Sequence, residues 1–104
     1  MAPRVLPLRR PAAHRTPDRR LVEQMTSGDE SAFHELFARF RGTVYATAYG
    51  ALRDPEEVEA TVADAFREAR RTAAEFLTSQ SSVSGWLTHL TRLCVAARLP
   101  RLSS

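Results

Sequence analysis

The strongest constraint on the fold is a long apolar stripe in the segment from Asp29 to Leu52. Apolar side chains recur in this segment at spacings of three and four residues, which is the period of one face of an α-helix. The residues of the stripe are Phe33, Leu36, Phe37, Phe40, Val44, Tyr45, Ala48 and Leu52. The segment predicts a long amphipathic helix with Asp29 as its N-cap, whose apolar face other elements must cover.

A third helix, which follows the long one, has the clearest start signal in the chain. Asp54 is expected to be its N-cap and Pro55 its first residue, and Glu57 completes a capping-box-like pair with Asp54. The apolar stripe of this helix consists of Val58, Val62, Ala65, Phe66, Ala69, Ala73 and Phe76.

Two shorter helices are expected at the ends of the folded part. The first runs from about Pro17 to Thr26, because Ser27-Gly28 is a typical helix end. The last begins near Ser84 and is stopped by Pro100, whose ring cannot continue a helix. The apolar positions of the last helix are Val83, Trp86, Leu87, Leu90, Cys94 and Ala97.

These patterns predict an all-α chain, since no segment alternates as a β-strand does. We expect a compact bundle of about four helices over residues 18–101, preceded by a disordered basic arm over residues 1–17. A chain of 104 residues suffices for one such domain and not for two. The side chains expected in the shared core of the last three helices are Phe37, Phe40, Tyr45, Val62, Phe66, Trp86 and Leu90.

The charge of the chain is unevenly distributed. Residues 1–20 hold six Arg and one acidic residue, a net charge of +5, whereas residues 21–104 carry a net charge of −2. Four Pro and the lack of apolar periodicity make residues 1–17 a solvated tail or an arm that touches nucleic-acid phosphates. The prolines argue against a transit peptide, and no apolar run is long enough for a secretory signal or a membrane span, so a cytoplasmic protein is expected.

Several kinds of chemistry lack a motif in this sequence. The three His are far apart, and Cys94 is a lone cysteine on an apolar stripe, where a buried thiol is expected. The four Gly form no phosphate-binding loop, and no nucleophile is placed beside a His–Asp pair. We therefore expect neither an enzyme nor a metal or cofactor site.

The order of the motifs resembles region 2 of the extracytoplasmic-function sigma factors of bacteria. The resemblance covers about residues 21–98 and depends on the spacing of several short motifs. They are Ser27-Gly28-Asp29-Glu30-Ser31-Ala32-Phe33, Leu36-Phe37, Asp54-Pro55-Glu56-Glu57-Val58-Glu59, Val62, Asp64, Phe66 and Trp86-Leu87 with Leu90 and Arg92. The resemblance implies a protein of transcription initiation that binds core RNA polymerase and the minus-ten element of promoter DNA.

The resemblance assigns a role to each half of the domain. The helix that begins at Asp54 would dock on the clamp helices of the largest polymerase subunit through Glu56, Glu59 and Asp64. The loop of residues 78–84 and the last helix would capture a flipped base and contact the melted strand. The DNA-binding residues expected there are Ser81, Ser82, Arg92, Arg98 and Arg101. Trp86 reads as a core anchor more readily than as a wedge in DNA.

The chain departs from the family pattern at several positions. Two polar contacts of the docking helix are replaced by Ala60 and Ala63, and the usual Asn of the last helix is Leu93. Region 4, which reads the minus-thirty-five element, is not part of this chain, so a separate region 4 chain or an anti-sigma factor are further expected partners. Two alternatives stay open: an interaction module or decoy that does not read DNA, and a truncated, inactive product.

The sequence allows two roles for Arg67, Arg70 and Arg71. They could bind phosphate, or they could form a solvated face paired with Glu68 and Glu75.

Overall fold

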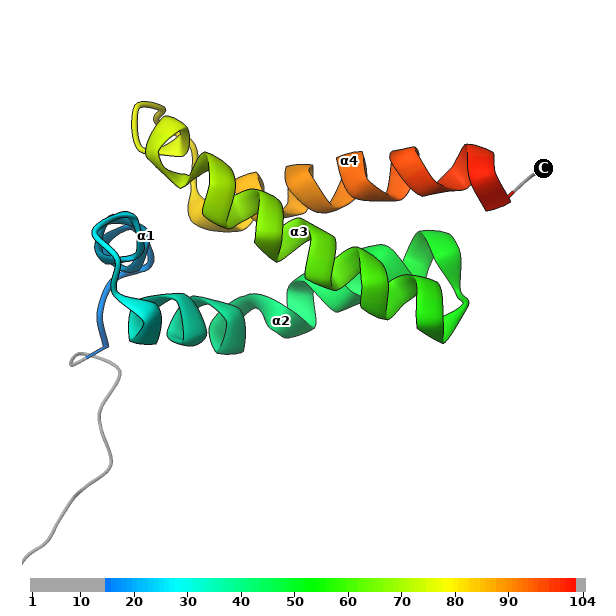
Figure 1. Cartoon of the computed structure of the whole chain (residues 1–104), viewed down its shortest axis with the longest axis horizontal. Helices are drawn as coiled ribbons and strands as arrows, with labels where there is room; N and C mark the ends of the chain where they lie inside the picture. Colours follow the sequence, from blue (N-terminus) through cyan, green and yellow to red (C-terminus); the bar gives the residue numbers. More distant parts are fainter. Residues whose placement is uncertain (1–14, 103–104) are drawn as a thin grey trace, which may run out of the picture.

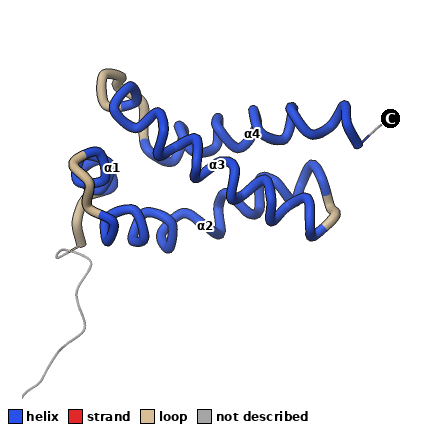
Figure 2. The backbone as a smooth tube through the Cα atoms, in the orientation of Figure 1, coloured by secondary structure: helices blue, strands red, loops and turns tan. Residues whose placement is uncertain are grey.

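The computed structural model describes residues 15–102, with side chains up to residue 100, and these residues form four α-helices. The helices are α1 (Asp18–Thr26), α2 (Glu30–Leu52), α3 (Pro55–Phe76) and α4 (Val83–Leu102). The long helices α2, α3 and α4 run up and down against one another, and α1 packs across one end of the bundle (Figure 1). The described part contains no strand (Figure 2), so the predicted all-α bundle is confirmed.

The predicted arm lies almost wholly outside the described residues, which begin at Arg15. Its last residues contact the bundle, because the backbone carbonyl of Thr16 accepts a hydrogen bond of 2.6 Å from Arg39 on α2. Fixed contacts therefore begin slightly earlier than the predicted boundary after residue 17. None of the helices in residues 15–102 combines the length and the apolar character that a membrane span requires.

The local signals at the start of α2 and α3 work as predicted, with one exception. The Asp29 carboxylate accepts from the Ala32 backbone N–H at 3.1 Å, and the Asp54 carboxylate accepts from that of Glu56 at 3.0 Å. The capping box is not formed, because the Asp54 N–H donates to the Leu52 carbonyl and the Glu57 carboxylate accepts from Arg98. A charged partner on another helix has replaced the local one.

Helix α4 differs from its prediction at both ends. It begins at Val83, because the Ser82 hydroxyl oxygen accepts from the Gly85 N–H at 3.0 Å and caps the helix. Pro100 lies inside α4, which continues to Leu102. Only one backbone donor is lost at Pro100, and so close to the end of a helix the loss affects little that follows.

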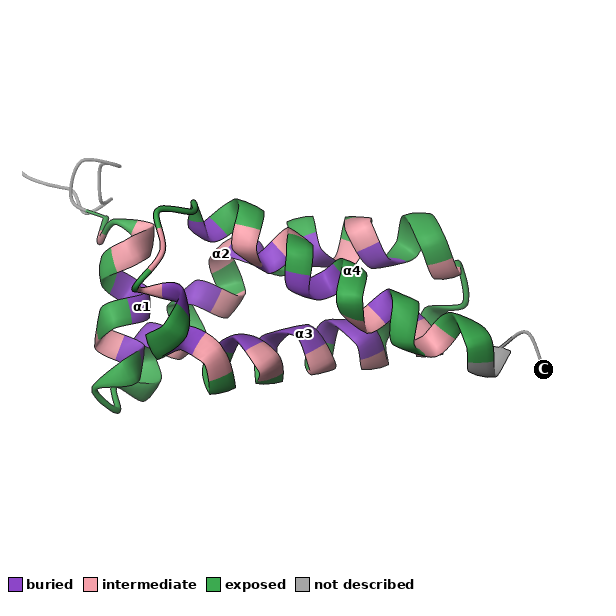
Figure 3. Cartoon of the chain, turned by 90° about the horizontal axis from the view of Figure 1, so that it is seen from above, coloured by how far each residue is buried: buried purple, intermediate pink, exposed green. Residues whose placement is uncertain are grey.

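The core lies where the apolar stripes of all four helices meet. Phe40, Val62, Phe66 and Leu90 are buried as predicted. The prediction is wrong in degree for Phe37, Tyr45 and Trp86, which are half-buried and pack against the core from its edge. The buried positions of α3 follow one side of the helix, which faces α2 and α4 (Figure 3). A stripe therefore identifies the inward face of a helix, but not the depth of each ring.

Candidate nucleic-acid interface

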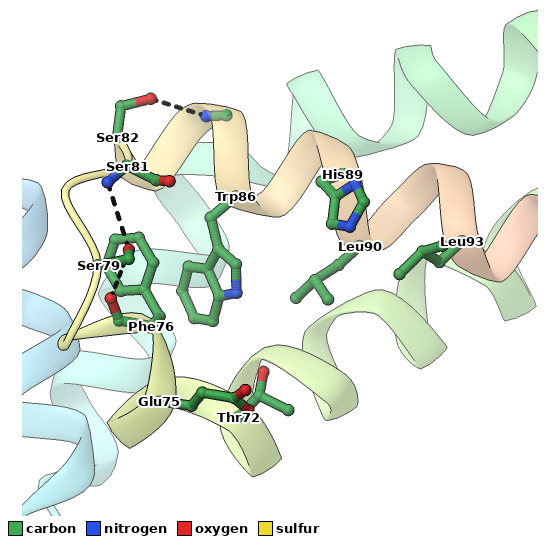
Figure 4. A pocket seen from close by; sticks show the side chains of 11 residues that line it. Thr72, Glu75, Phe76, Ser79, Ser81, Ser82, Trp86, His89, Leu90 and Leu93 are labelled. Carbon is green, nitrogen blue, oxygen red and sulfur yellow. Dashed lines mark hydrogen bonds between the residues drawn. The ribbon is translucent and has the colours of Figure 1, made fainter.

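An open groove of about 620 Å³ lies where the end of α3, the loop of residues 77–82 and the first half of α4 meet (Figure 4). This region includes the loop and the helix face to which the resemblance assigns DNA contact. The groove is lined by Thr72, Glu75, Phe76, Ser79, Ser81, Ser82, Gly85, Trp86, His89, Leu90 and Leu93.

The floor of the groove is a stacked aromatic pair. The rings of Phe76 and Trp86 have their centroids 4.2 Å apart and are inclined by 15°. Phe76 is buried, whereas Trp86 is half-buried and its indole N–H has no acceptor among the described residues. Leu93, at the far end of the groove, is 54% exposed. The floor thus offers a flat apolar surface beside a free hydrogen-bond donor.

The loop beside the groove is held in place by Arg19 of α1. The Arg19 guanidinium donates to the carbonyls of Leu77 at 2.8 Å, Ser79 at 2.7 Å and Ser81 at 3.3 Å. It also lies 4.8 Å from the centre of the Phe76 ring. The sequence patterns do not single out Arg19, because its partners are about 60 residues away and are backbone atoms. Arg19 therefore fixes the loop that borders the groove, although it does not line the groove itself.

The two serines predicted to contact DNA have different surroundings. Ser82 is exposed, but its hydroxyl oxygen already caps α4. The exposed Ser81 uses its backbone N–H to donate to the Ser79 hydroxyl at 3.3 Å. The Ser79 hydroxyl in turn donates to the Phe76 carbonyl at 2.7 Å. Ser81 therefore keeps the freer side chain of the two predicted serines.

The predicted arginines of α4 are not equivalent. Arg92 is exposed and lies one turn of α4 from His89, which lines the groove. Arg98 is only 17% exposed in its side chain and donates to Glu57 at 2.6 Å and to Asp64 at 2.9 Å. The side chain of Arg101 lies outside the described residues. Arg92 is thus the arginine of the described part of α4 that is open to a ligand.

The pair of Arg98 and Asp64 joins two residues that were predicted to bind different partners. Burial by itself raises the pKa of Asp64, but hydrogen bonds from Arg98 and Arg67 outweigh it and hold the pKa below its ordinary value of 3.8. The Asp64 hydrogen bond also raises the pKa of Arg98, although burial opposes this. Both groups stay charged at neutral pH, and they hold α4 against α3.

The three acidic residues predicted to dock on polymerase do not share one face of α3. Glu56 is exposed, and Glu59 lies 3.9 Å from Arg41 of α2. Asp64 instead turns toward α4, consistent with the angle of about 140° that five residues subtend on a helix. An open acidic face therefore contains Glu56 and Glu59, next to the exposed Ala63.

The arginines in the second half of α3 have acidic partners. Arg67 contacts Asp64 at 2.7 Å and Arg71 contacts Glu68 at 2.8 Å. Arg70 pairs with Glu30 of α2, and its guanidinium carbon lies 4.2 Å from the centre of the Phe33 ring, which is also on α2. Only Arg71 has a partner that the ion-pair interpretation named, since Arg67 and Arg70 pair with Asp64 and Glu30 instead of Glu68 and Glu75.

Other chemistry near the groove is limited. Cys94 is half-buried, and burial, followed by the nearby Asp64 and Glu68, raises the pKa of its thiol. No group of His, Cys, Asp and Glu among residues 15–100 is arranged to hold a metal ion.

No family model, curated protein or solved structure matches the chain.

Proposed function

We propose that the groove binds an unstacked base of single-stranded promoter DNA, and that the chain acts in transcription initiation in the manner of sigma region 2. The observation that carries the proposal is the stacked pair of Phe76 and Trp86 on the floor of an open groove. A flipped base presents a flat ring and polar edges. The groove offers an aromatic surface for the ring and the indole N–H and the Ser81 hydroxyl for the edges.

The energetics suit single strands better than duplexes. Stacking of one base on an aromatic side chain contributes about 1–3 kcal/mol, and it is available only to a base that has left the duplex stack. Extraction of a base from a duplex costs a few kcal/mol. A groove with a single stacking platform therefore stabilises DNA that is already open, and weakly at that.

The phosphate contacts of the proposed complex are few. Arg92 is exposed one turn of α4 beyond His89, which lines the groove, whereas Arg98 would have to leave its two carboxylates before it could reach a phosphate. Each neutralised phosphate of a single strand contributes about −0.7 to the logarithmic salt dependence of binding. We expect a shallow salt dependence from the described residues, and a steeper one only if the basic residues 1–14 take part.

A titration of fluorescently labelled oligonucleotides tests this proposal. We expect the anisotropy of a short single strand to rise with protein concentration at lower concentrations than that of the matching duplex. Leu93→Glu, which places a negative charge on the exposed rim of the groove, should weaken single-strand binding by about ten-fold, because its carboxylate would repel the phosphates of the bound strand. Ala46→Glu, at an exposed position of α2, is the matched control and should bind as the wild type does.

Polymerase docking is the second part of the proposal. Glu56 and Glu59 on the exposed side of α3 suit a basic partner surface, and charges at the rim of an interface mainly raise the rate of association. The methyl groups of Ala60 and Ala63 supply no hydrogen bonds, so a weak complex with core polymerase is expected.

An interaction module without DNA reading is the alternative function. The ion pairs of Arg98 and the acidic Glu75 in the groove favour it, because both lower the affinity for phosphate. The two functions differ in one result: an interaction module binds core polymerase or an anti-sigma factor, but its groove leaves a single-stranded oligonucleotide unbound.

A further inference from the structure

We infer that the groove has a second occupant within this chain: residues 1–14, bound in an extended conformation in competition with DNA. Residues 1–14 lie outside the described part, and the inference uses their sequence only. It rests on the proposed function for the identity of the competitor, but occupation of the groove can be measured without DNA.

The groove has the chemistry that binds extended, proline-containing peptides. Such segments adopt the polyproline-II conformation, whose backbone carbonyls have no internal partner and accept hydrogen bonds from a receptor. Receptors for them are grooves lined by aromatic side chains. Trp86 and Phe76 provide this lining, the free indole N–H provides a donor, and the exposed Leu93 extends the apolar surface along α4.

The sequence of residues 1–14 matches these features. Polyproline II has three residues per turn, so Val5, Leu8 and Pro11 would form one apolar edge, with successive side chains about 9 Å apart. Leu6 and the three arginines, Arg4, Arg9 and Arg10, do not belong to that edge. The apolar edge would lie on the aromatic floor and leave the arginines at the rim.

Charge favours this occupant over a phosphate backbone. Among the residues that line the groove, Glu75 is the acidic one, and none is Arg or Lys. Residues 1–14 contain three Arg and no acidic residue. A basic segment therefore complements the rim of the groove, whereas a phosphate would be repelled by Glu75.

The segment closely precedes α1, the helix that holds the loop beside the groove. Arg19 binds the carbonyls of Ser79 and Ser81, so the start of α1 lies against the loop that borders the groove. The fourteen residues before Arg15 would span roughly 40 Å at 3.1 Å per residue. A short tether gives an effective concentration in the millimolar range, so even a weak contact would be populated.

Fluorescence of Trp86, the single tryptophan of the chain, tests occupation of the groove directly. Quenching by acrylamide is measured on the full-length wild type, on Leu8→Ser, and on Leu6→Ser as the matched control from another edge of the segment. We expect Leu8→Ser to raise the quenching constant about two-fold, as for a site that is half occupied, and Leu6→Ser to leave it unchanged. Equal quenching in all three proteins overturns the inference. Far-UV circular dichroism should be the same for all three, since no residue of the four helices is changed.

The competition is tested by the affinity of the same three proteins for a single-stranded oligonucleotide. Leu8→Ser should bind about two-fold more tightly than the wild type and Leu6→Ser. A change in quenching without binding of DNA by any variant supports occupation of the groove and removes the proposed DNA function. Equal affinities together with a change in quenching contradict the competition. Equal quenching with clear binding of DNA leaves the proposed function standing and removes this inference.

Discussion

Thr61 is a buried polar residue without compensation. It is fully buried in α3, and its hydroxyl has no hydrogen-bond partner among the described residues. Valine has nearly the same shape and needs no partner, so Thr61→Val should raise the free energy of unfolding by about 1 kcal/mol. Urea denaturation gives the value. Thr91→Val is the control, because the buried Thr91 hydroxyl donates to the Leu87 carbonyl at 2.7 Å and its removal should bring no such gain. A loss of stability in Thr61→Val would contradict the conclusion that the buried Thr61 hydroxyl makes no hydrogen bond.

At the residue scale, inward faces are predictable from the sequence and partners across helices are not. The stripes identify Phe40, Val62 and Phe66 as core residues, because helical periodicity fixes the direction of a side chain. Periodicity does not identify the residues of neighbouring helices that each side chain contacts. The stacking of Trp86 on Phe76 and the pairing of Arg98 with Asp64 depend on how α3 and α4 cross, and residues far apart in the sequence meet there.

Among the elements, α3 and α4 are joined by a polar cluster that should respond to pH. Arg98→Met keeps the length of the side chain but removes the charge that joins Glu57 and Asp64 to α4, and leaves Asp64 with Arg67 alone. We expect a loss of about 1–2 kcal/mol of unfolding free energy at neutral pH, a modest value because the carboxylates are partly exposed.

The pH dependence of this loss has a definite sign. Because the pKa of Asp64 is held below 3.8 in the folded chain, its stabilising contribution is present above that pH and is lost as the pH falls through the lowered value. The difference between wild type and Arg98→Met should therefore shrink in acid below about pH 4. A difference that stays constant from neutral pH to pH 3, in urea melts at each pH, would show that packing and not charge joins the two helices.

Element boundaries follow local signals except where a distant partner intervenes. Asp29 and Asp54 cap α2 and α3 as their positions in the sequence predict, because an N-cap needs only its own next residues. Glu57 leaves its predicted capping box for Arg98, and α4 continues past Pro100. Neither the Glu57–Arg98 contact nor the continuation of α4 past Pro100 can be predicted from the neighbouring residues in the sequence.

For the whole molecule, the proposed docking on polymerase would use the exposed side of α3. Restoring polar groups by Ala60→Asp and Ala63→Gln should tighten binding to core polymerase by about ten-fold, because hydrogen bonds to charged groups contribute about 1.5–3 kcal/mol each at best. Ala63 is exposed and Ala60 is half-buried, so Ala63→Gln alone should supply most of the gain. The measurement is a titration of core polymerase, with Ala46→Gln on α2 as the control. Tight binding of the wild type with no gain in the variants would contradict this docking surface.

If a base of single-stranded DNA stacks in the groove beside Trp86, as proposed, the indole N–H of this single tryptophan reports on the stacking directly. In a two-dimensional proton–nitrogen NMR spectrum it gives one resolved indole signal. Addition of a short single-stranded oligonucleotide should shift this signal progressively until one equivalent is bound, and the matching duplex should move it far less. An unmoved indole signal in a sample where the oligonucleotide is demonstrably bound would place the DNA elsewhere and contradict base stacking in the groove.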